Sequence, residues 1–143
     1  MIIKQLSVFV ENKKGKLGFI TQKLAENDVD ISSLALADTT DFGVLRIIVD
    51  KPDVAYRALT EAGVVVKISD VVAVAMDDVP GGVSSALKVV ADNDINIEYV
   101  YACVGKTAGK ALMVIKPEDL EKAEAVLYQA GYGKISPADI YRI

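Results

Sequence analysis

The sequence predicts an α+β fold in which one βαββαβ unit occurs twice. Three observations support this: an internal repeat at an offset of 66 residues, alternating strand-like and helix-like apolar patterns, and a hydrophobic fraction of 52%. The 143 residues allow about 70 for each copy, which is small but sufficient for a core. We expect copies at residues 1–69 and 70–143, forming a continuous antiparallel sheet with helices on one face.

The repeat is a colinear series of matching residues. Gly15 aligns with Gly81, and residues 26–31 (Glu-Asn-Asp-Val-Asp-Ile) align with residues 92–97 (Asp-Asn-Asp-Ile-Asn-Ile). The match resumes near the end of each copy, after a short insertion in the second. Duplication explains such a series better than chance does.

Each copy shows the same order of elements. Strands are expected near residues 2–10, 29–38 and 44–50, and near 71–76, 95–104 and 110–116, with hairpins near 41–43 and 107–109. Helical apolar stripes are formed by Leu17, Ile20, Leu24, Ala55, Ala58, Leu59 and Ala62, and by Val83, Leu87, Val90, Leu120, Ala123, Leu127 and Ala130. Pro52 and Pro117 suit the first turns of the second helices.

This order is the ferredoxin-like split βαβ arrangement. The last strand is open to two interpretations. Residues 64–68 can close the first copy, or residues 139–143 can return to pair with it.

Composition excludes several kinds of chemistry. The chain has no histidine or tryptophan and one cysteine, Cys103, which rules out Ser-His-Asp and Cys-His catalysis, histidine metal sites and CxxC motifs. A formal charge of −4 is a poor match for nucleic acid or an anionic membrane. We expect Cys103 to be a buried structural thiol, and Asp77 and Asp78 to be solvated turn residues. No enzyme activity, metal or cofactor is expected.

The sequence predicts a soluble, cytoplasmic protein. Its longest apolar runs, at 71–76 and 99–104, are far short of the ~20 residues that cross a bilayer. The first residues lack the basic start and apolar stretch of a signal peptide, and a single cysteine fits a reducing compartment.

One face of the predicted sheets is more apolar than a solvated surface. On the third strands, Leu45, Ile47, Val49, Ala111, Met113 and Ile115 are placed toward the helices. The opposite face then carries Val44, Arg46, Ile48, Lys110, Leu112 and Val114. We expect this face to pack on that of a second chain, forming a homodimer; a loop or terminus lying across it is the alternative.

Each copy has a turn between its first strand and first helix that is suited to a charged ligand. Exposed N–H groups at a helix N-terminus bind carboxylates, and Asn12 or Asp78 can hold an ammonium or amide group. The start of the second strand adds Asp30 or Asn96. Together these groups suit a zwitterion; alternatively, they are ordinary turn and strand-start residues.

The residues at these positions resemble the ACT domain, a small regulatory module. Its pattern of strand, polar residue, Pro-Gly, helix and Asn-Ile is similar to residues 77–83 (Asp-Asp-Val-Pro-Gly-Gly-Val) followed by residues 93–98 (Asn-Asp-Ile-Asn-Ile-Glu). The first copy departs from it, because 13–15 lacks the proline and Asp30 replaces the asparagine. The resemblance covers essentially the whole chain, with no catalytic domain attached, and implies a stand-alone tandem ACT protein.

ACT domains commonly bind amino acids between two side-by-side copies. The resemblance implies that the turn of one copy faces the second strand of its neighbour. The ligand-binding residues it implies are Asn12, Lys14, Gly15, Lys16, Leu17, Asp30, Ile31, Asp78, Pro80, Gly81, Gly82, Val83, Asn96 and Ile97.

Two functional hypotheses follow. The first is a non-catalytic regulatory sensor that binds an amino acid at the interface between two ACT-like units and shifts the population of two arrangements. The alternative is a regulatory subunit that contacts an enzyme of amino-acid metabolism, with ligand binding degenerate. A catalytic role is weaker than both, because the sequence offers no activated nucleophile or acid–base pair.

Overall fold

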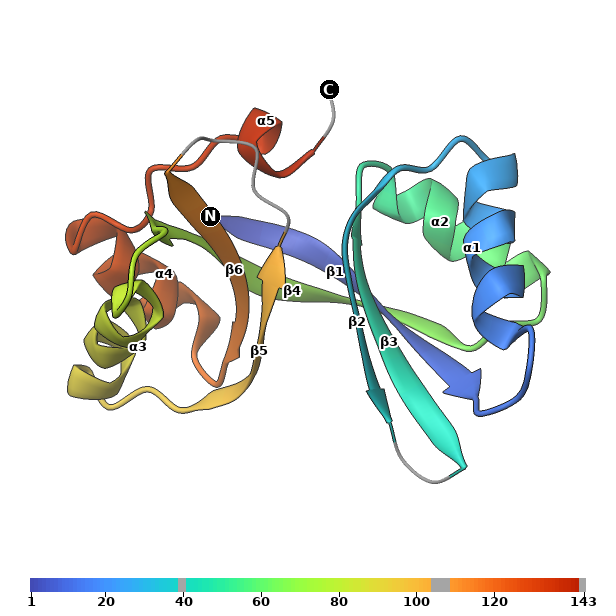
Figure 1. The fold of residues 1–143 in the computed structure, drawn as a ribbon, viewed down its shortest axis with the longest axis horizontal. Coiled ribbons are helices and arrows are strands. Elements are labelled where there is room, and N and C mark those ends of the chain that lie inside the picture. Colours follow the sequence, from blue (N-terminus) through green and yellow to red (C-terminus); the bar gives the residue numbers. More distant parts are fainter. Residues whose placement is uncertain (39–40, 104–108, 142–143) are drawn as a thin grey trace. The chain divides into compact units, whose positions relative to one another are not determined.

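The computed structural model describes residues 1–38, 41–103 and 109–141. Its strands are ordered β2-β3-β1-β4-β6-β5 in one sheet, and the βαββα order of elements occurs twice (Figure 1). The fold is α+β, with two tandem ferredoxin-like units, as the sequence predicts. The elements are β1 (Ile2–Glu11), α1 (Lys16–Glu26), β2 (Ile31–Asp38), β3 (Phe42–Val49), α2 (Pro52–Glu61), β4 (Val66–Asp77), α3 (Gly82–Asp92), β5 (Ile97–Cys103), β6 (Lys110–Pro117), α4 (Leu120–Gln129) and α5 (Pro137–Ile140).

The chain divides into two compact units. The first unit consists of Lys4–Ser69 with Tyr141, and the second consists of Asp70–Ile140 with Met1–Ile3. The predicted boundary between residues 69 and 70 lies inside the continuous strand β4, so a division into two domains there stays a prediction.

In the first unit, β3 pairs antiparallel with both β1 and β2, and α1 and α2 cover one face of these strands (Figure 1). The predicted stripe on α1 is correct for Ile20 and Leu24, which are buried, but Leu17 is 40% exposed because it lies in the first turn. The core consists of Leu6, Val8, Val10, Ile20, Leu24, Val29, Leu45, Ile47, Val49, Ala55 and Leu59.

In the second unit, β6 pairs antiparallel with both β4 and β5, and α3 and α4 cover one face (Figure 1). Pro117 was expected in a helix but ends β6, because the carboxylate of Asp119 caps a helix that begins at Leu120. Pro52, in contrast, does start its helix. The core consists of Val72, Val74, Met76, Ala86, Val90, Ile95, Met113, Ile115, Ala123 and Leu127.

The chain entering β4 lies beside β1 in the first unit, where the N–H of Phe9 donates to the carbonyl oxygen of Val65 at 2.9 Å. Val64, Val66 and Ile68 pack against the first core, so residues 64–68 close this unit. In the second unit, the N–H of Ala73 donates to the carbonyl oxygen of Met1 at 2.8 Å.

The C-terminal strand offered as the alternative is not formed over Pro137–Ile140, which is helical, and residues 142–143 lie outside the described part. Most of the hairpin expected near 107–109 lies outside it too. None of the helices in the described ranges is long and apolar enough to cross a membrane.

The sheet face opposite the helices differs from the expectation in one respect. Leu45, Ile47 and Val49 do pack with the helices. On the opposite face, however, Ile48, Leu112 and Val114 are 0%, 5% and 0% exposed within the single chain.

Candidate functional site

The turn between β1 and α1 holds five of the residues that the sequence singles out. The N–H of Asn12 donates to the carbonyl oxygen of Asp41 at 3.0 Å, which fixes the end of β1. Gly15 then adopts a left-handed φ of 82° and forms the N-cap of α1, a conformation that favours glycine. The five residues, all exposed, are Asn12, Lys14, Gly15, Lys16 and Leu17.

The turn between β4 and α3 repeats this geometry in the second unit. The N–H of Asp78 donates to the carbonyl oxygen of Gly109 at 3.0 Å, and Gly81 caps α3 with a φ of 87°. Pro80 and Val83 are exposed, whereas Gly82 is half-buried. A Cβ at Gly82 would lie 2.3 Å from the carbonyl oxygen of Asp77, so only glycine fits this position without movement.

The glycine caps determine what the two turns can bind. The N-cap residues Gly15 and Gly81 have no side chain that could hydrogen-bond to the start of α1 or α3. In α4, by contrast, the Asp119 carboxylate accepts a hydrogen bond from the N–H of Lys122 at 3.0 Å. The first N–H groups, of Lys16 and Gly82, donate to the carbonyl oxygens of Lys13 and Val79. Because a glycine cap offers no side-chain acceptor, the next N–H groups of α1 and α3 are suited to an external carboxylate.

The second-strand residues lie at the other end of the sheet within each unit. Ile31 pairs with Val49, whereas Glu11, just before the first turn, pairs with Phe42. The length of β3 therefore separates the turn from the start of β2, about 23 Å at 3.3 Å per residue. Within one unit, the two halves of the implied site do not meet.

Backbone contacts hold the second-strand starts in place. The N–H of Asp50 donates to the carbonyl oxygen of Asp30 at 3.2 Å, and the N–H of Glu118 donates to that of Asn96 at 2.9 Å. The N–H of Asp30 also donates to the Asp50 carboxylate at 2.9 Å. Ile31 and Ile97 follow at the first positions of β2 and β5, where both are half-buried. These positions are equivalent in the two units.

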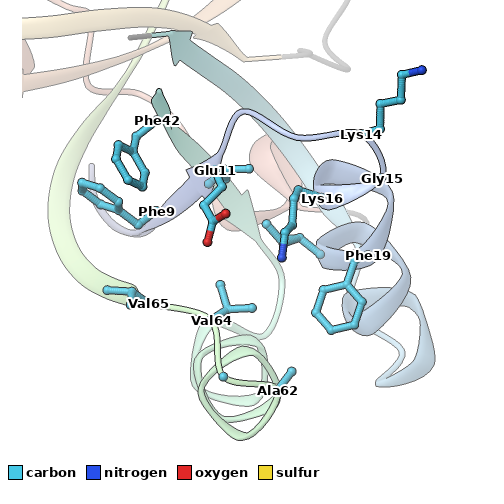
Figure 2. Close-up of a pocket in the computed structure, with 13 residues that line it drawn as sticks. Phe9, Glu11, Lys14, Gly15, Lys16, Phe19, Phe42, Ala62, Val64 and Val65 are labelled. Atoms are coloured by element: carbon cyan, nitrogen blue, oxygen red, sulfur yellow. The ribbon is translucent and has the colours of Figure 1, made fainter. Parts of the chain in front are cut away.

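A groove of about 540 Å³ lies beside the first turn, entirely within the first unit (Figure 2). It contains the predicted residues Lys14, Gly15 and Lys16. The rest of its lining was missed by the sequence analysis, because it comes from segments far apart in the chain. These residues are Phe9, Val10, Glu11, Phe19, Ile20, Phe42, Ala62, Gly63, Val64 and Val65.

Charge is concentrated near Glu11 in this groove. The ammonium group of Lys13 lies 2.9 Å from the Glu11 carboxylate. Their hydrogen bond lowers the pKa of Glu11 below its ordinary value, assisted by the charges of Lys13 and Lys16, and raises the pKa of Lys13. Glu11 therefore carries a negative charge at neutral pH.

A smaller hollow of about 200 Å³ is also lined in part by Lys16, again within the first unit. Asn12, Lys16 and Leu17, three of the predicted residues, help to line it with Leu36 of β2. Residues of the first turn thus line both hollows.

The groups considered for catalysis have structural surroundings. Cys103 is buried, with 8% of its surface exposed, as predicted. Asp77 forms an ion pair with Lys110 at the strand end. Among the residues that the structure describes, no cluster of three or more carboxylates or thiols is positioned to hold a metal ion.

The fold and the paired glycine turns define a duplicated ferredoxin-like module. The chain belongs to the family described as the ACT domain pair, whose model matches residues 1–142. None of the curated proteins compared with the chain matches it.

Solved structures share the fold over nearly the whole length. Protein BT0572 from Bacteroides thetaiotaomicron is 36% identical, with a TM-score of 0.91, over 100% of this chain and 98% of its own. The regulatory subunit of aspartate kinase from Thermus thermophilus is 19% identical, with a TM-score of 0.66, over 92% of this chain and 97% of its own. The corresponding subunit from Thermus flavus is also 19% identical, with a TM-score of 0.60, over 91% and 95%.

Proposed function

We propose that this ACT domain pair is a non-catalytic regulatory protein that binds an amino acid at the interface between two ACT-like units. The observation that carries the proposal is the duplicated turn: Gly15 and Gly81, at φ 82° and 87°, start α1 and α3 without a side-chain cap. The first-turn N–H groups suit a carboxylate, and Asn12 or Asp78 beside them suits an ammonium group.

The separation of the turn from the second strand supports an interface site. The turn residues and Asp30 or Asn96 lie at opposite ends of one unit, so a ligand that uses both needs a neighbouring unit. We expect the turn of one unit to face the second strand of another, from the same or a second chain. A ligand that prefers one arrangement of the units then changes its population, which is how binding would regulate.

The test is a thermal-shift screen of the twenty amino acids at millimolar concentration with the full chain. A ligand that binds only the native state raises the melting temperature, so at least one amino acid is expected to do so. No shift with any of them would contradict the proposal.

The Asp78→Ala variant makes the test specific for the turn. The backbone N–H of Asp78 makes the contact to Gly109 and its side chain is exposed, so the unliganded protein should keep its stability within about 0.5 kcal/mol. The dissociation constant of an amino acid bound at the turn of the second unit should rise about tenfold, because a charge-assisted hydrogen bond is lost. Asp92→Ala is the matched control: it removes an exposed carboxylate, paired with Lys88, from the far end of α3, and should leave affinity unchanged.

A regulatory subunit that contacts an enzyme of amino-acid metabolism is the second candidate. It is favoured by the aspartate kinase regulatory subunits, whose fold the chain shares. The test is to immobilise the chain and to measure which enzyme it retains in the presence of each of the twenty amino acids. Retention of one enzyme that no amino acid changes would favour the regulatory subunit over the sensor.

A homodimer through the helix-free sheet face also stays a prediction. Val44 and Arg46 on that face are half-buried, but Ile48, Leu112 and Val114 are already buried in the single chain, so the argument is weaker than the sequence indicated. Sedimentation equilibrium should give twice the chain mass; a monomer mass would contradict the dimer.

A further inference from the structure

All three phenylalanines of the chain line the groove of the first unit. Phe9 comes from β1, Phe19 from α1 and Phe42 from β3, and they are 55%, 41% and 47% exposed. Phenylalanine is normally among the most buried residues, so three exposed rings around one hollow indicate a surface that makes a contact. Val65, 71% exposed, adds to it from the segment before β4.

Two opposite charges lie between these rings. Figure 2 shows the side chains of Glu11 and Lys16 extending into the groove, with Phe9 and Phe42 on one side and Phe19 on the other; Lys14 points away. Lys16 stands in the first turn of α1, where the helix dipole adds partial positive charge. The groove therefore offers one anionic and one cationic group within aromatic walls.

We propose that this groove binds a free amino acid with a bulky apolar side chain. The ammonium group of the ligand lies on Glu11, its carboxylate lies beside Lys16 and the start of α1, and its side chain packs on Phe9 and Phe42. A volume of about 540 Å³ is within the range of small-molecule sites. This proposal rests on the proposed function, and it deepens it by naming the ligand class and the residues that the first unit contributes to the binding site.

The second unit lacks the same lining. The repeat places Ala75 at the position of Phe9, Ser85 at that of Phe19 and Gly82 at that of Lys16. These residues provide neither aromatic walls nor a cation. We therefore expect one such site in each chain.

Isothermal titration calorimetry of the full chain with L-phenylalanine tests the proposal. Binding is expected with one ligand per chain. Phenylacetate, which lacks the ammonium group, and phenethylamine, which lacks the carboxylate, should each bind at least about tenfold more weakly, as should L-alanine, which lacks the apolar side chain.

Two variants locate the site. Phe19→Ala and Glu11→Gln should each weaken L-phenylalanine binding about tenfold, through loss of a ring contact and of a charge respectively. Tyr56→Ala is the control, because Tyr56 is an aromatic residue on α2 with the same 41% exposure as Phe19 and lies outside the groove lining. It should leave the affinity unchanged.

The failures can be told apart. If none of the twenty amino acids binds, both this proposal and the proposed function fail. If a polar amino acid binds and L-phenylalanine does not, or if Phe19→Ala binds L-phenylalanine normally, the groove assignment fails while the proposed function stands. If Phe19→Ala instead converts a dimer to a monomer in sedimentation without changing the affinity, the groove is an interface between copies, and the assignment is overturned.

Discussion

The turns that start α1 and α3 share a backbone and differ in their side chains. Gly15 and Gly81 have φ values of 82° and 87°, and neither helix has a side-chain cap. At the next position the first unit has Lys16, whereas the second has Gly82 packed against the backbone of Asp77. Duplication has preserved the hydrogen-bonding geometry of the turn and let its side chains diverge.

The surroundings of the turns diverge further. Phe9 and Phe19 stand in the first unit where Ala75 and Ser85 stand in the second. A contact made through backbone N–H groups is therefore available in both units, but aromatic contacts are available in the first. The better match to the ACT pattern therefore occurs in the second unit, and the groove with aromatic and charged side chains occurs in the first.

The largest expected effect is a change in the free energy of unfolding at the position after the glycine cap, where the two turns differ. Gly82→Ala should lower the free energy of unfolding by about 2–4 kcal/mol, because its Cβ would meet the Asp77 carbonyl oxygen at 2.3 Å. Lys16→Ala, at the equivalent position, should change it by less than about 0.5 kcal/mol. Urea unfolding measures both; equal losses would show that the two turns do not differ in this contact.

The next largest effect, a loss of unfolding free energy at the glycine caps, should be the same in both units. Gly15→Ala and Gly81→Ala should each cost about 1–2 kcal/mol of unfolding free energy, because their φ of 82° and 87° is left-handed although each has open space for a Cβ. Gly18→Ala in α1 is the control: it also has open space but no positive φ, and should stabilise the chain by about 0.5–1 kcal/mol. A loss at one turn alone would break the backbone equivalence.

The smallest effect concerns pH and the groove of the first unit. Lys13 lowers the pKa of Glu11 from its ordinary 4.5, so Glu11 stays ionised, and L-phenylalanine affinity stays constant, until the pH falls below that value. Lys13→Met should raise the pKa of Glu11 and move the loss of affinity to higher pH, because the hydrogen bond and the charge of Lys13 are lost. The other charged side chains that line this groove are Lys14 and Lys16, whereas residues 62–65, which also line it, have no titratable side chain.

Calorimetry across the acid range measures this shift. Lys23→Met, which removes the ion pair with Glu26 on the exposed side of α1, should not move the profile. An unchanged profile in the Lys13 variant would show that Glu11 does not hold the ammonium group.

Much of the fold could be predicted, because periodicity and turn residues are local signals. Ile20 and Leu24 were placed correctly in the core, and Asn27 and Asp28 end α1, with Asp28 at a left-handed φ of 53°. The prediction for Pro117 was wrong, since a proline fits a strand end as well as a helix start, and only the cap at Asp119 distinguishes them.

The candidate site was predictable where it depends on one segment. The turn residues from Asn12 to Leu17 could be read from a strand, a glycine and a helix in succession. The groove could not, because Phe9, Phe19 and Phe42 meet only through strand pairing and helix packing. A signal was present, however: Phe9 stands at a position of β1 whose neighbours Val8 and Val10 face the core, so its ring had to lie on the other side.

The continuity of β4 has a consequence for how the two copies can be separated. Val66–Asp77 serves as the closing strand of the first unit and the opening strand of the second. Met1–Ile3 belongs to the second unit, although it is distant from that unit in sequence. A fragment that starts at Asp70 would leave Ala73 without its hydrogen bond to Met1. Cutting the gene at the repeat boundary would therefore yield two incomplete halves. The two copies are better compared by exchanging their turn residues within the full chain than by removing one copy.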